Sequence, residues 1–349
     1  MTNSNSEEAI GAPFERLLQE CCKPKDVREI EREGIGPASA TLWRTLDESG
    51  FINALVAEEK GGAGLDLASV YGIFESCGRY ALPLPLGETM IARALLAGMG
   101  HPVPSEPIAL GCASHEGGDL VCQLVPYART ANFALLKVED KLLLLPCEPA
   151  QRSLLAAHAC SGELRWPAAA LNTARVVCSN ANVLHMQACV LACQIAGAIG
   201  RVFSMTLNYA NDRVQFAKPI GKFQAVQHQI SVMAEHAAMA RMAARIGCDS
   251  ISYLPHERRV AIAKSVTSEA AASVAALGHA LHGAIGMTEE HDLQLYTRRL
   301  HEWRLCAGTE SYWQRELGAA LLEARGMSAL DFVRGSLNNK TSSDLIGNG

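Results

Sequence analysis

The chain has no surplus of positive charge. Its 31 lysine and arginine residues stand against 36 aspartate and glutamate residues, giving a formal net charge of −5. A protein that binds nucleic acid usually concentrates basic residues on one face. The short basic pairs Arg258–Arg259 and Arg298–Arg299 are better explained as solvated helix faces or salt-bridge partners. The composition therefore gives no support to a nucleic-acid-binding function.

Metal-ligand spacing is also missing. The twelve cysteines are scattered, and no two of them follow a Cys-x-x-Cys pattern. Cys189 and Cys193 lie one helical turn apart, which is poor geometry for a structural zinc site without further ligands. We expect reduced, buried thiols, no bound metal and a cytoplasmic location.

No targeting or membrane-spanning segment is evident. Residues 1–8 are polar and acidic, without the basic and then apolar order of a signal peptide. The most apolar window, residues 183–200, is interrupted by His185, Gln187 and Gln194. A membrane span needs about 20 mostly apolar residues, so this window predicts a buried core helix.

The chain is long enough for two or three domains. Residues 13–101 predict a helical domain, in which Pro37 can begin one helix and Asp66 can cap another. Residues 102–178 alternate short apolar runs with turn residues, which predicts a small β domain. Strands are expected over residues 108–112, 120–125, 134–138 and 142–145, with Glu139-Asp140 as a hairpin turn between the last two. Residues 179–334 carry apolar residues at steps of three and four, typical of an alanine-rich antiparallel helical bundle. Residues 1–12 and 335–349 are expected to be disordered tails, and the fold class is α+β, mainly α.

Residues 213–224 form a cationic, aromatic linker between two long helical patterns. Pro219 and Gly221 break the helix, which should restart near Phe223 or Gln224. Arg213 can offer a fork of donors to a phosphate or carboxylate, and Phe216 can offer a face to a planar ring. On spacing alone, two interpretations stay open: a site for an anion and a ring, or a helix–helix turn with a solvated arginine and a core phenylalanine.

The linker resembles the signature of the acyl-CoA dehydrogenase family. Its sequence Arg-Val-Gln-Phe-Ala-Lys-Pro-Ile-Gly-Lys-Phe-Gln matches a family motif, and residues 282–290, His-Gly-Ala-Ile-Gly-Met-Thr-Glu-Glu, match a second. Gly308-Thr309 stands where the family carries Glu-Gly-Thr, and residues 42–88 are similar to its first helical domain. The resemblance implies a helical, β and then helical fold, which agrees with the domain prediction.

The resemblance implies a cofactor and an assembly. Members of the family use FAD for α,β-dehydrogenation of an acyl-CoA thioester, and their flavin site is shared between subunits. It therefore implies an FAD-dependent oxidoreductase of lipid or steroid catabolism, working as a homodimer, a tetramer or an α2β2 complex with a related chain. The residues that match cofactor contacts of the family are Arg213, Gln215, Phe216, Ile220, Phe223, Gln224, Gly283 and Thr309.

Both positions that carry the catalytic base in this family lack a carboxylate. The glutamate before Gly-Thr is replaced by Ala307, and the alternative position on the preceding long helix falls at Gln187. Neither side chain can accept a proton near neutral pH. Ala280, Ala284 and Arg299 also depart from the family pattern.

Two carboxylates remain near the missing base. Glu310 follows Gly308-Thr309 at a predicted helix N-terminus, where a negative charge is favoured. We therefore expect it to serve as a cap, and it is the fallback candidate for a base. Glu302 lies in an arginine-rich helix and is expected to form ion pairs. The identity of the base is left unknown.

Three functional hypotheses follow. The chain could share a flavin site with a different, base-bearing partner, as do the short base-less subunits of bacterial steroid side-chain degradation that it resembles. It could be a homo-oligomeric flavoenzyme with a base elsewhere. It could also be a non-catalytic scaffold or acyl-CoA binder that has lost flavin.

Arg213 gives the first test. We expect Arg213→Ala to weaken FAD retention by on the order of 1.5–3 kcal/mol, because charge-assisted hydrogen bonds to phosphate are lost. Arg213→Lys should restore only part, since a point charge cannot reproduce the planar fork. The measurement is flavin content after purification, and unchanged content in the alanine variant would contradict the assignment.

Overall fold

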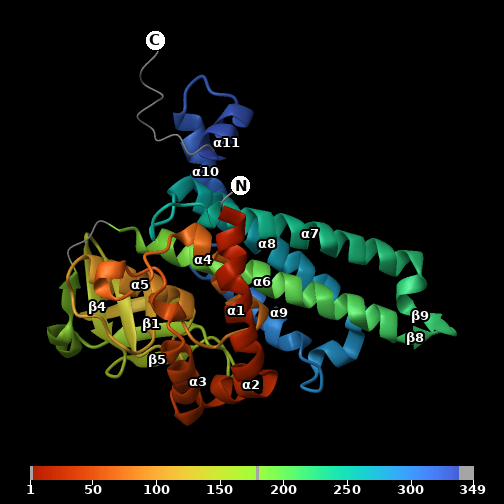
Figure 1. The fold of residues 1–349 in the computed structure, drawn as a ribbon, viewed down its shortest axis with the longest axis horizontal. Coiled ribbons are helices and arrows are strands. Elements are labelled where there is room, and N and C mark those ends of the chain that lie inside the picture. Colours follow the sequence, from red (N-terminus) through yellow and green to blue (C-terminus); the bar gives the residue numbers. More distant parts are fainter. Residues whose placement is uncertain (1–2, 178–180, 338–349) are drawn as a thin grey trace.

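The computed structural model describes residues 3–177 and 181–337. Helices form the N-terminal part, a sheet lies in the middle of the chain, and long helices form the C-terminal part (Figure 1). The prediction of a mainly helical α+β fold is confirmed.

The secondary structure of the described residues is as follows. The helices are α1 (Asn3–Cys21), α2 (Pro24–Glu33), α3 (Pro37–Glu48), α4 (Leu67–Arg79), α5 (Leu86–Gly98), α6 (Val183–Asp212), α7 (Gln224–Cys248), α8 (Glu257–His282), α9 (Leu293–Leu305), α10 (Glu310–Glu323) and α11 (Ala329–Leu337). The strands are β1 (Ile108–Glu116), β2 (Asp119–Val125), β3 (Phe133–Val138), β4 (Lys141–Pro146), β5 (Gln151–Leu154), β6 (Gly162–Trp166), β7 (Arg175–Val177), β8 (Val214–Gln215) and β9 (Lys218–Pro219). The 3₁₀ segments are η1 (Phe51–Asn53), η2 (Glu58–Lys60), η3 (Ala168–Thr173), η4 (Ile220–Lys222) and η5 (Gly283–Met287).

Helix starts in the N-terminal part follow their local signals. α3 begins at Pro37, whose missing N–H and fixed φ suit the first turn. Asp66 caps α4, and its carboxylate accepts a hydrogen bond of 2.9 Å from the backbone N–H of Ser69. These two predictions are correct.

The prediction that residues 1–12 form a disordered tail is wrong for Asn3 onward. α1 begins at Asn3 and continues through Pro13 to Cys21. Phe14 and Leu18 are fully buried, and a Cβ on Gly11 would lie 3.3 Å from the Cα of Gly72 in α4. Packing against α4 therefore stabilises a segment whose own composition favours disorder. At the other end, residues 335–337 belong to α11, and residues 338–349 lie outside the described part.

The middle part is one mixed sheet in the order β5-β6-β2-β1-β3-β4-β7. β1 and β3 run parallel, and the other neighbouring pairs are antiparallel. The predicted turn at Glu139-Asp140 does join β3 to β4 as a hairpin. β5 and β7 are short strands at the two edges of the sheet and lack a strong apolar alternation, which explains why the sequence did not reveal them.

α6 is the central helix of the C-terminal part. From Val183 to Ile199 it is almost entirely buried, and it packs against α4, α7, α8 and α9. α6 and the segment from Glu257 to Met287 are long and apolar enough to cross a membrane, but most of each lies inside the protein. The apolar run that resembles a membrane span is therefore the core helix of this fold, as predicted.

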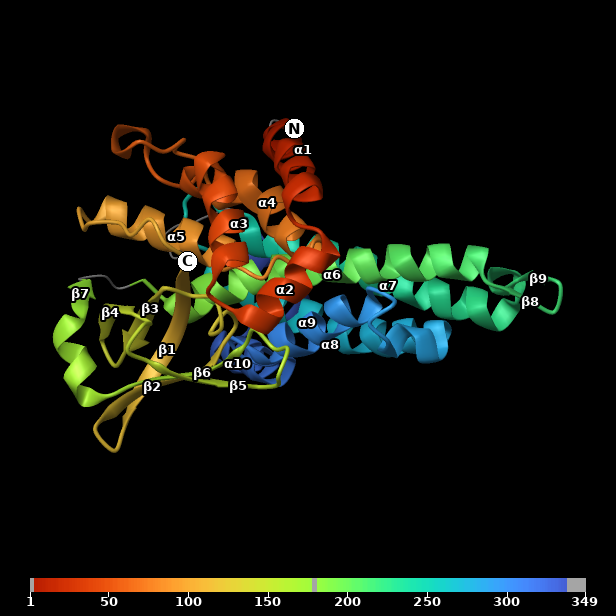
Figure 2. The same ribbon diagram turned by 90° about the horizontal axis from the view of Figure 1, so that it is seen from below.

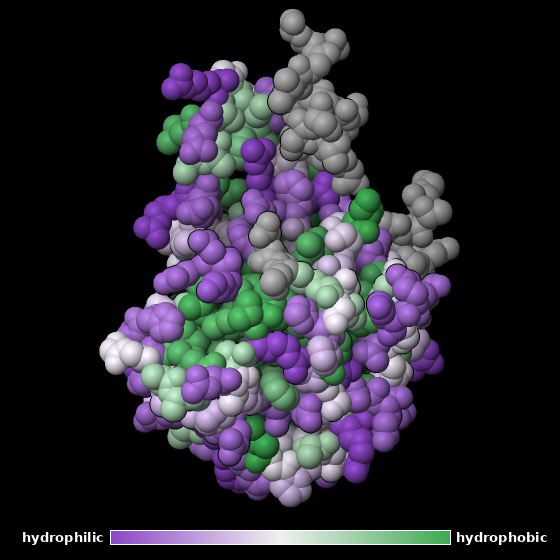
Figure 3. Space-filling model, turned by 90° about the vertical axis from the view of Figure 1, so that its left-hand side faces the viewer, coloured by the Kyte–Doolittle hydropathy of each residue, from purple (hydrophilic) through white to green (hydrophobic). Residues whose placement is uncertain are grey.

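Beyond the core, α6 and α7 form an arm. They run side by side away from the sheet and end at the β8–β9 hairpin (Figure 2). At the opposite, sheet end of the molecule, hydrophobic side chains gather in the middle of the surface and hydrophilic ones surround them (Figure 3). One end of the molecule thus carries a projecting hairpin, and the other carries a hydrophobic surface patch.

α4 and α6 touch backbone to backbone through glycine. A Cβ on Gly197 would lie 1.9 Å from the carbonyl oxygen of Glu75, and a Cβ on Gly78 would lie 1.8 Å from that of Gln194. Such a contact excludes any side chain unless the two helices move apart. The pair therefore sets the distance between the N-terminal helices and the core helix.

Gly197→Ala should lower the free energy of unfolding by about 1–3 kcal/mol, because the added methyl group forces α4 and α6 apart. Gly318→Ala in α10 is the matched control, since a Cβ there meets no atom within 4 Å. The control should raise stability by roughly 0.5–1 kcal/mol through helix propensity. Denaturant unfolding measures both, and equal effects at the two positions would contradict the close contact.

Candidate functional site

The cationic linker forms the tip of the arm. Val214–Gln215 and Lys218–Pro219 pair as two short antiparallel strands, and Phe216 and Ala217 occupy the turn with φ of 53° and 62°. Two consecutive positive φ angles are typical of a type I′ hairpin turn, which normally takes Asn or Gly. Non-glycine residues at both positions cost local strain, and such strain is found most often at functional sites.

The side chains of the tip point away from the body. Phe216 is 88% exposed, and its ring lies 6.2 Å from that of Phe223. The ammonium of Lys218 lies 4.3 Å from the Phe223 ring centre. Arg213, Gln215 and Gln224 are also exposed. The interpretation of Phe216 as a core residue is therefore wrong, because its side chain is exposed and its one ring contact among the described residues is with Phe223, at the start of α7.

Gly283 belongs to the same end of the molecule. It ends α8 with φ 64°, a conformation that favours glycine. The neighbouring His282 stacks on Tyr209 of α6 with ring centres 4.5 Å apart. A Cβ on Gly283 would meet no atom of the described residues within 4 Å, so its backbone is open to a close approach from outside. The structure thus brings Gly283 to the same end of α6 as the tip residues Arg213, Gln215, Phe216, Ile220, Phe223 and Gln224.

The two base positions lie near the opposite end of α6, where they have different neighbours. His185 on α6 packs edge-on against Trp313 of α10, with ring centres 5.1 Å apart. The indole N–H of Trp313 donates to the carbonyl of Ala307 at 2.9 Å. Gln187 lies one half-turn beyond His185 on α6. Thr309, the remaining predicted cofactor contact, caps α10 here by accepting from the N–H of Tyr312 at 3.3 Å.

Gln187 is held by a buried carboxyl group that sequence reasoning missed. Its side-chain amide donates to the carbonyl of Leu110 and to Glu88 Oε1, the latter at 3.4 Å. Glu88 Oε2 accepts from the N–H of Leu110 at 2.7 Å. Burial raises the pKa of Glu88 to about 8, although these two donors oppose the shift. A glutamate in a helix as apolar as α5 was the available signal, because such residues are buried only with partners.

The two other carboxylates close to Ala307 in the sequence, Glu302 and Glu310, both have hydrogen-bond or ion-pair partners. Glu310 is the first residue of α10 and pairs with the guanidinium of Arg304. Partial burial works to raise the pKa of Glu310, but the Arg304 hydrogen bond, a backbone hydrogen bond and the positive charges of Arg304 and Lys264 together hold the pKa below its usual value. Glu302 accepts a 3.1 Å hydrogen bond from the N–H of Ser161. Both groups thus have structural partners, which weakens the case for Glu310 as a base.

A long helix separates the two groups of predicted residues. Gln187 lies near the start of α6 and Arg213 directly follows its end. At 1.5 Å per residue, they stand roughly 40 Å apart along the helix, which is too far for a single dinucleotide to bridge. The tip and the base positions of one chain therefore cannot serve the same cofactor.

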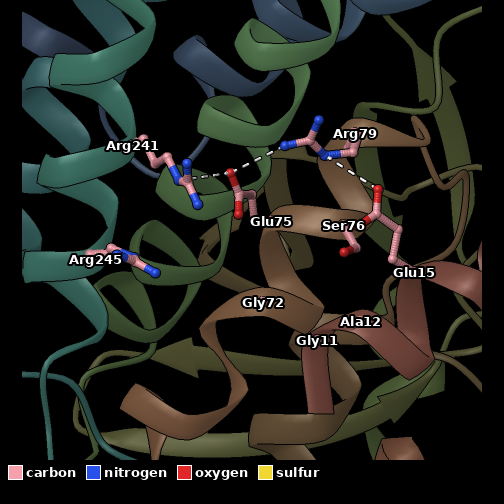
Figure 4. Close-up of a pocket in the computed structure, with 9 residues that line it drawn as sticks. All are labelled: Gly11, Ala12, Glu15, Gly72, Glu75, Ser76, Arg79, Arg241 and Arg245. Carbon is pink, nitrogen blue, oxygen red and sulfur yellow. Dashed lines mark ion pairs between the residues drawn. The ribbon is translucent and has the colours of Figure 1, made fainter. Parts of the chain in front are cut away.

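The described surface also carries cavities away from these groups. One of about 450 Å³ lies between α1, α4 and α7. In it, Arg79 lies between Glu15 and Glu75 at 3.7 and 3.6 Å, and Arg241 lies 3.7 Å from Glu75 (Figure 4). The cavity contains none of the predicted site residues, and its carboxylates offset most of its positive charge.

The buried thiols offer no metal site. Cys248 Sγ lies 3.6 Å from Cys189 Sγ and 3.3 Å from Cys193 Sγ, inside the bundle. Within residues 3–177 and 181–337, no set of three or more His, Cys, Asp or Glu side chains is arranged to hold a metal ion. All cysteines of this part are free thiols.

Comparison with known proteins decides the family. Residues 4–102 match the acyl-CoA dehydrogenase N-terminal domain, and residues 171–322 match the acyl-CoA dehydrogenase C-terminal domain. The acyl-CoA dehydrogenase IpdE2 of Mycobacterium tuberculosis is 31% identical over 324 residues, covering 86% of this chain and 92% of the relative. The chain belongs to the acyl-CoA dehydrogenase family. It is accordingly an oxidoreductase of the type that acts on acyl-CoA.

Other relatives agree. IpdE2 of Mycolicibacterium smegmatis is 28% identical over 308 residues, covering 85% of this chain and 93% of the relative. The ChsE4-ChsE5 complex from Mycobacterium tuberculosis has the same fold, with a TM-score of 0.72, 20% identity, and coverage of 93% of this chain and 98% of that chain. The "Tcur3481-Tcur3483 steroid ACAD G363A variant" gives a TM-score of 0.73 at 20% identity, covering 93% and 100%.

The family is FAD-dependent, and the tip suits part of that cofactor. Arg213 forms no ion pair with any described carboxylate of its own chain, so its guanidinium is open to a phosphate. The exposed face of Phe216 can stack on a planar ring, and Gly283 leaves its backbone uncovered. These residues fit the adenine and phosphate end of FAD.

Glu88 should make stability depend on pH. Its pKa in the folded chain, about 8, lies above the ordinary value, so the folded state holds the proton more tightly than the unfolded state. The resulting stabilisation is complete below the ordinary carboxyl pKa and declines by about 1.4 kcal/mol per pH unit until the folded pKa is passed.

Glu88→Gln keeps the shape and an acceptor for Leu110 N–H but does not titrate. Denaturant unfolding at pH 5.5 and pH 8 should show the variant gaining stability relative to the wild type as pH rises. A constant difference between the two proteins would contradict a buried, proton-holding Glu88.

Proposed function

We propose that the chain is the base-less subunit of an acyl-CoA dehydrogenase that performs FAD-dependent α,β-dehydrogenation of an acyl-CoA thioester, with a related chain supplying the catalytic glutamate. The observation that carries the proposal is an uncovered cofactor-contact tip combined with Ala307 and Gln187 at the two base positions. A chain that had lost cofactor binding would have no need of an exposed Phe216 beside an unpaired arginine.

The length of α6 supports an assembly of at least two chains. The tip and the base positions lie roughly 40 Å apart along this helix, so each must be completed by a neighbour. A structural neighbour is a complex of two named chains, ChsE4 and ChsE5, which favours an α2β2 arrangement over a homodimer or homotetramer. The free thiols suit a reducing compartment, and we place the complex in the cytoplasm.

The substrate class follows from the same relatives. One neighbour is described as a steroid acyl-CoA dehydrogenase, and we infer that this chain serves lipid or steroid catabolism.

The chemistry divides between cofactor and protein. FAD, when bound, supplies an acceptor for the β-hydrogen as hydride. Arg213, Phe216 and Gly283 of this chain would hold the phosphate and adenine end of an FAD molecule whose flavin lies in a neighbouring chain. The backbone N–H of Ala307 can donate to the thioester oxygen and stabilise charge that develops there. The carboxylate of the partner removes the α-proton.

Glu88 supports a second candidate, a homo-oligomeric enzyme with its own unusual base. Its carboxyl group hydrogen-bonds to Gln187, and a pKa of about 8 is near the optimum for proton transfer at neutral pH. The side chain is fully buried, however, and two donors hold its oxygens. It therefore reaches no substrate without a rearrangement of α5.

Carboxylates placed at the two base positions should behave differently. The wild-type chain alone is expected to oxidise saturated acyl-CoA very slowly, since a positioned base contributes about 10²–10⁴-fold. Ala307→Glu should raise turnover. Gln187→Glu should not, because the new carboxylate would lie against Glu88 and share its proton. Flavin reduction under substrate, followed near 450 nm, measures both variants.

Reconstitution supplies the decisive comparison. Adding a base-bearing relative should restore turnover far more than Ala307→Glu, and light scattering should give the mass of a dimer or larger assembly. Rapid turnover by the wild-type chain alone, abolished by Glu88→Gln, would favour the second candidate. A colourless protein, inactive in every combination, would favour a scaffold without flavin.

A further inference from the structure

Lys264 on α8 is a buried cation that none of the preceding chemistry uses. Its side chain is fully buried, and its ammonium donates to three oxygens: Ser268 Oγ at 2.9 Å, Arg304 O at 3.1 Å and Gly308 O at 2.9 Å. An ammonium has three N–H donors and no acceptor, so the surroundings match the charged form. No carboxylate of the described residues lies in ion-pair range of Lys264.

Gly308 O lies in the turn between α9 and α10, and Arg304 O lies in the last turn of α9. Ala307 and Gly308 both have positive φ, 52° and 86°, and a non-glycine residue in this region costs energy that its surroundings must offset. Lys264 holds Gly308 O on one side, and the Trp313 indole holds Ala307 O on the other. The turn thus keeps its shape through two buried donors from different helices.

The N–H groups of this turn have no partner of their own. Among the described residues, no acceptor is within hydrogen-bonding geometry of the backbone N–H of Ala307, Gly308 or Thr309. Successive N–H groups in a left-handed turn form a concave site for an oxygen that carries negative charge. A buried cation behind the same turn raises the attraction, because burial leaves its field poorly screened.

We propose that Lys264 is a positioning residue, whose ammonium holds the Ala307–Thr309 turn with its N–H groups directed at the thioester oxygen of the acyl-CoA. This role rests on the proposed function, since that function places the thioester at Ala307. The residue touches neither substrate nor cofactor and acts through the backbone of the turn.

The charge of Lys264 depends on its neighbours on four elements. Burial lowers its pKa to about 7, while the carboxylate of Glu310 raises the pKa and the guanidinium of Arg304 lowers it. Cys306 stays neutral because burial raises its own pKa to about 12. Burial also lowers the pKa of His185, which lies beside Trp313. Glu88 titrates near pH 8, so it must be removed in any experiment that varies pH.

The test compares two ligands that differ in one oxygen. Butanoyl-CoA has the thioester carbonyl, and S-butyl-CoA has a methylene in its place. Calorimetry on the wild-type chain should show tighter binding of the thioester. In Lys264→Met, which keeps length without charge, this preference should fall by about 10-fold, while the affinity for S-butyl-CoA changes less than 2-fold. Equal losses for both ligands, or no preference in the wild type, would overturn the proposal.

A second measurement needs no change at Lys264 and stands if Lys264→Met fails to fold. In Glu88→Gln, the preference for butanoyl-CoA should fall as pH rises from 6 to 8, because Lys264 loses its proton. A preference that is constant over this range would also overturn the proposal. The same measurements separate this proposal from the proposed function. If the chain prefers the thioester in a pH-dependent way but its flavin is not reduced, the role of Lys264 stands and only the dehydrogenation is contradicted.

Discussion

The rigidity of α6 is the constraint on which the rest of the structure depends. Its first half is buried among four helices, and Gly197 seats it against α4 without an intervening side chain. A straight helix of 30 residues spans about 45 Å, so its two ends cannot approach each other. One end is followed by the exposed tip with Arg213 and Phe216, and the other carries Gln187, which contacts Glu88 and Leu110. The tip and the base positions of one chain are therefore too far apart to contact the same cofactor molecule.

Buried polar groups lie near the N-terminal end of α6, the end that carries Gln187, and their burial costs energy; we call this the inner end. Glu88 and Lys264 are fully buried, and their ordinary charged forms are penalised by burial. Apolar residues would stabilise a core better than a lone ammonium does. Each group instead organises backbone next to a base position, Glu88 through Leu110 and Gln187, and Lys264 through Arg304 and Gly308. The loss of the family carboxylates has thus not turned this region into plain hydrophobic core.

Much of the fold was readable from local pattern. The cap at Asp66, the helix start at Pro37 and the β3–β4 hairpin depend on contacts within a few residues, and all three appear as predicted. The start of α1, before Pro13, was missed because its stability comes from packing against α4, some 60 positions along the chain. The edge strands β5 and β7 were missed because strand pairing, and not apolar alternation, creates them.

The sequence by itself determined the family, the order of helical and β parts, the identity of the tip residues and the absence of a carboxylate at positions 187 and 307. These follow from residue types at fixed spacing, which a linear pattern records. Only the tertiary structure decided that Phe216 faces outward and that the tip and the base positions lie at opposite ends of α6. It also decided that Glu88 and Lys264 are buried near the base positions. Burial and charge depend on which distant segments meet, and partners such as Glu88 and Gln187 leave no trace in either segment alone.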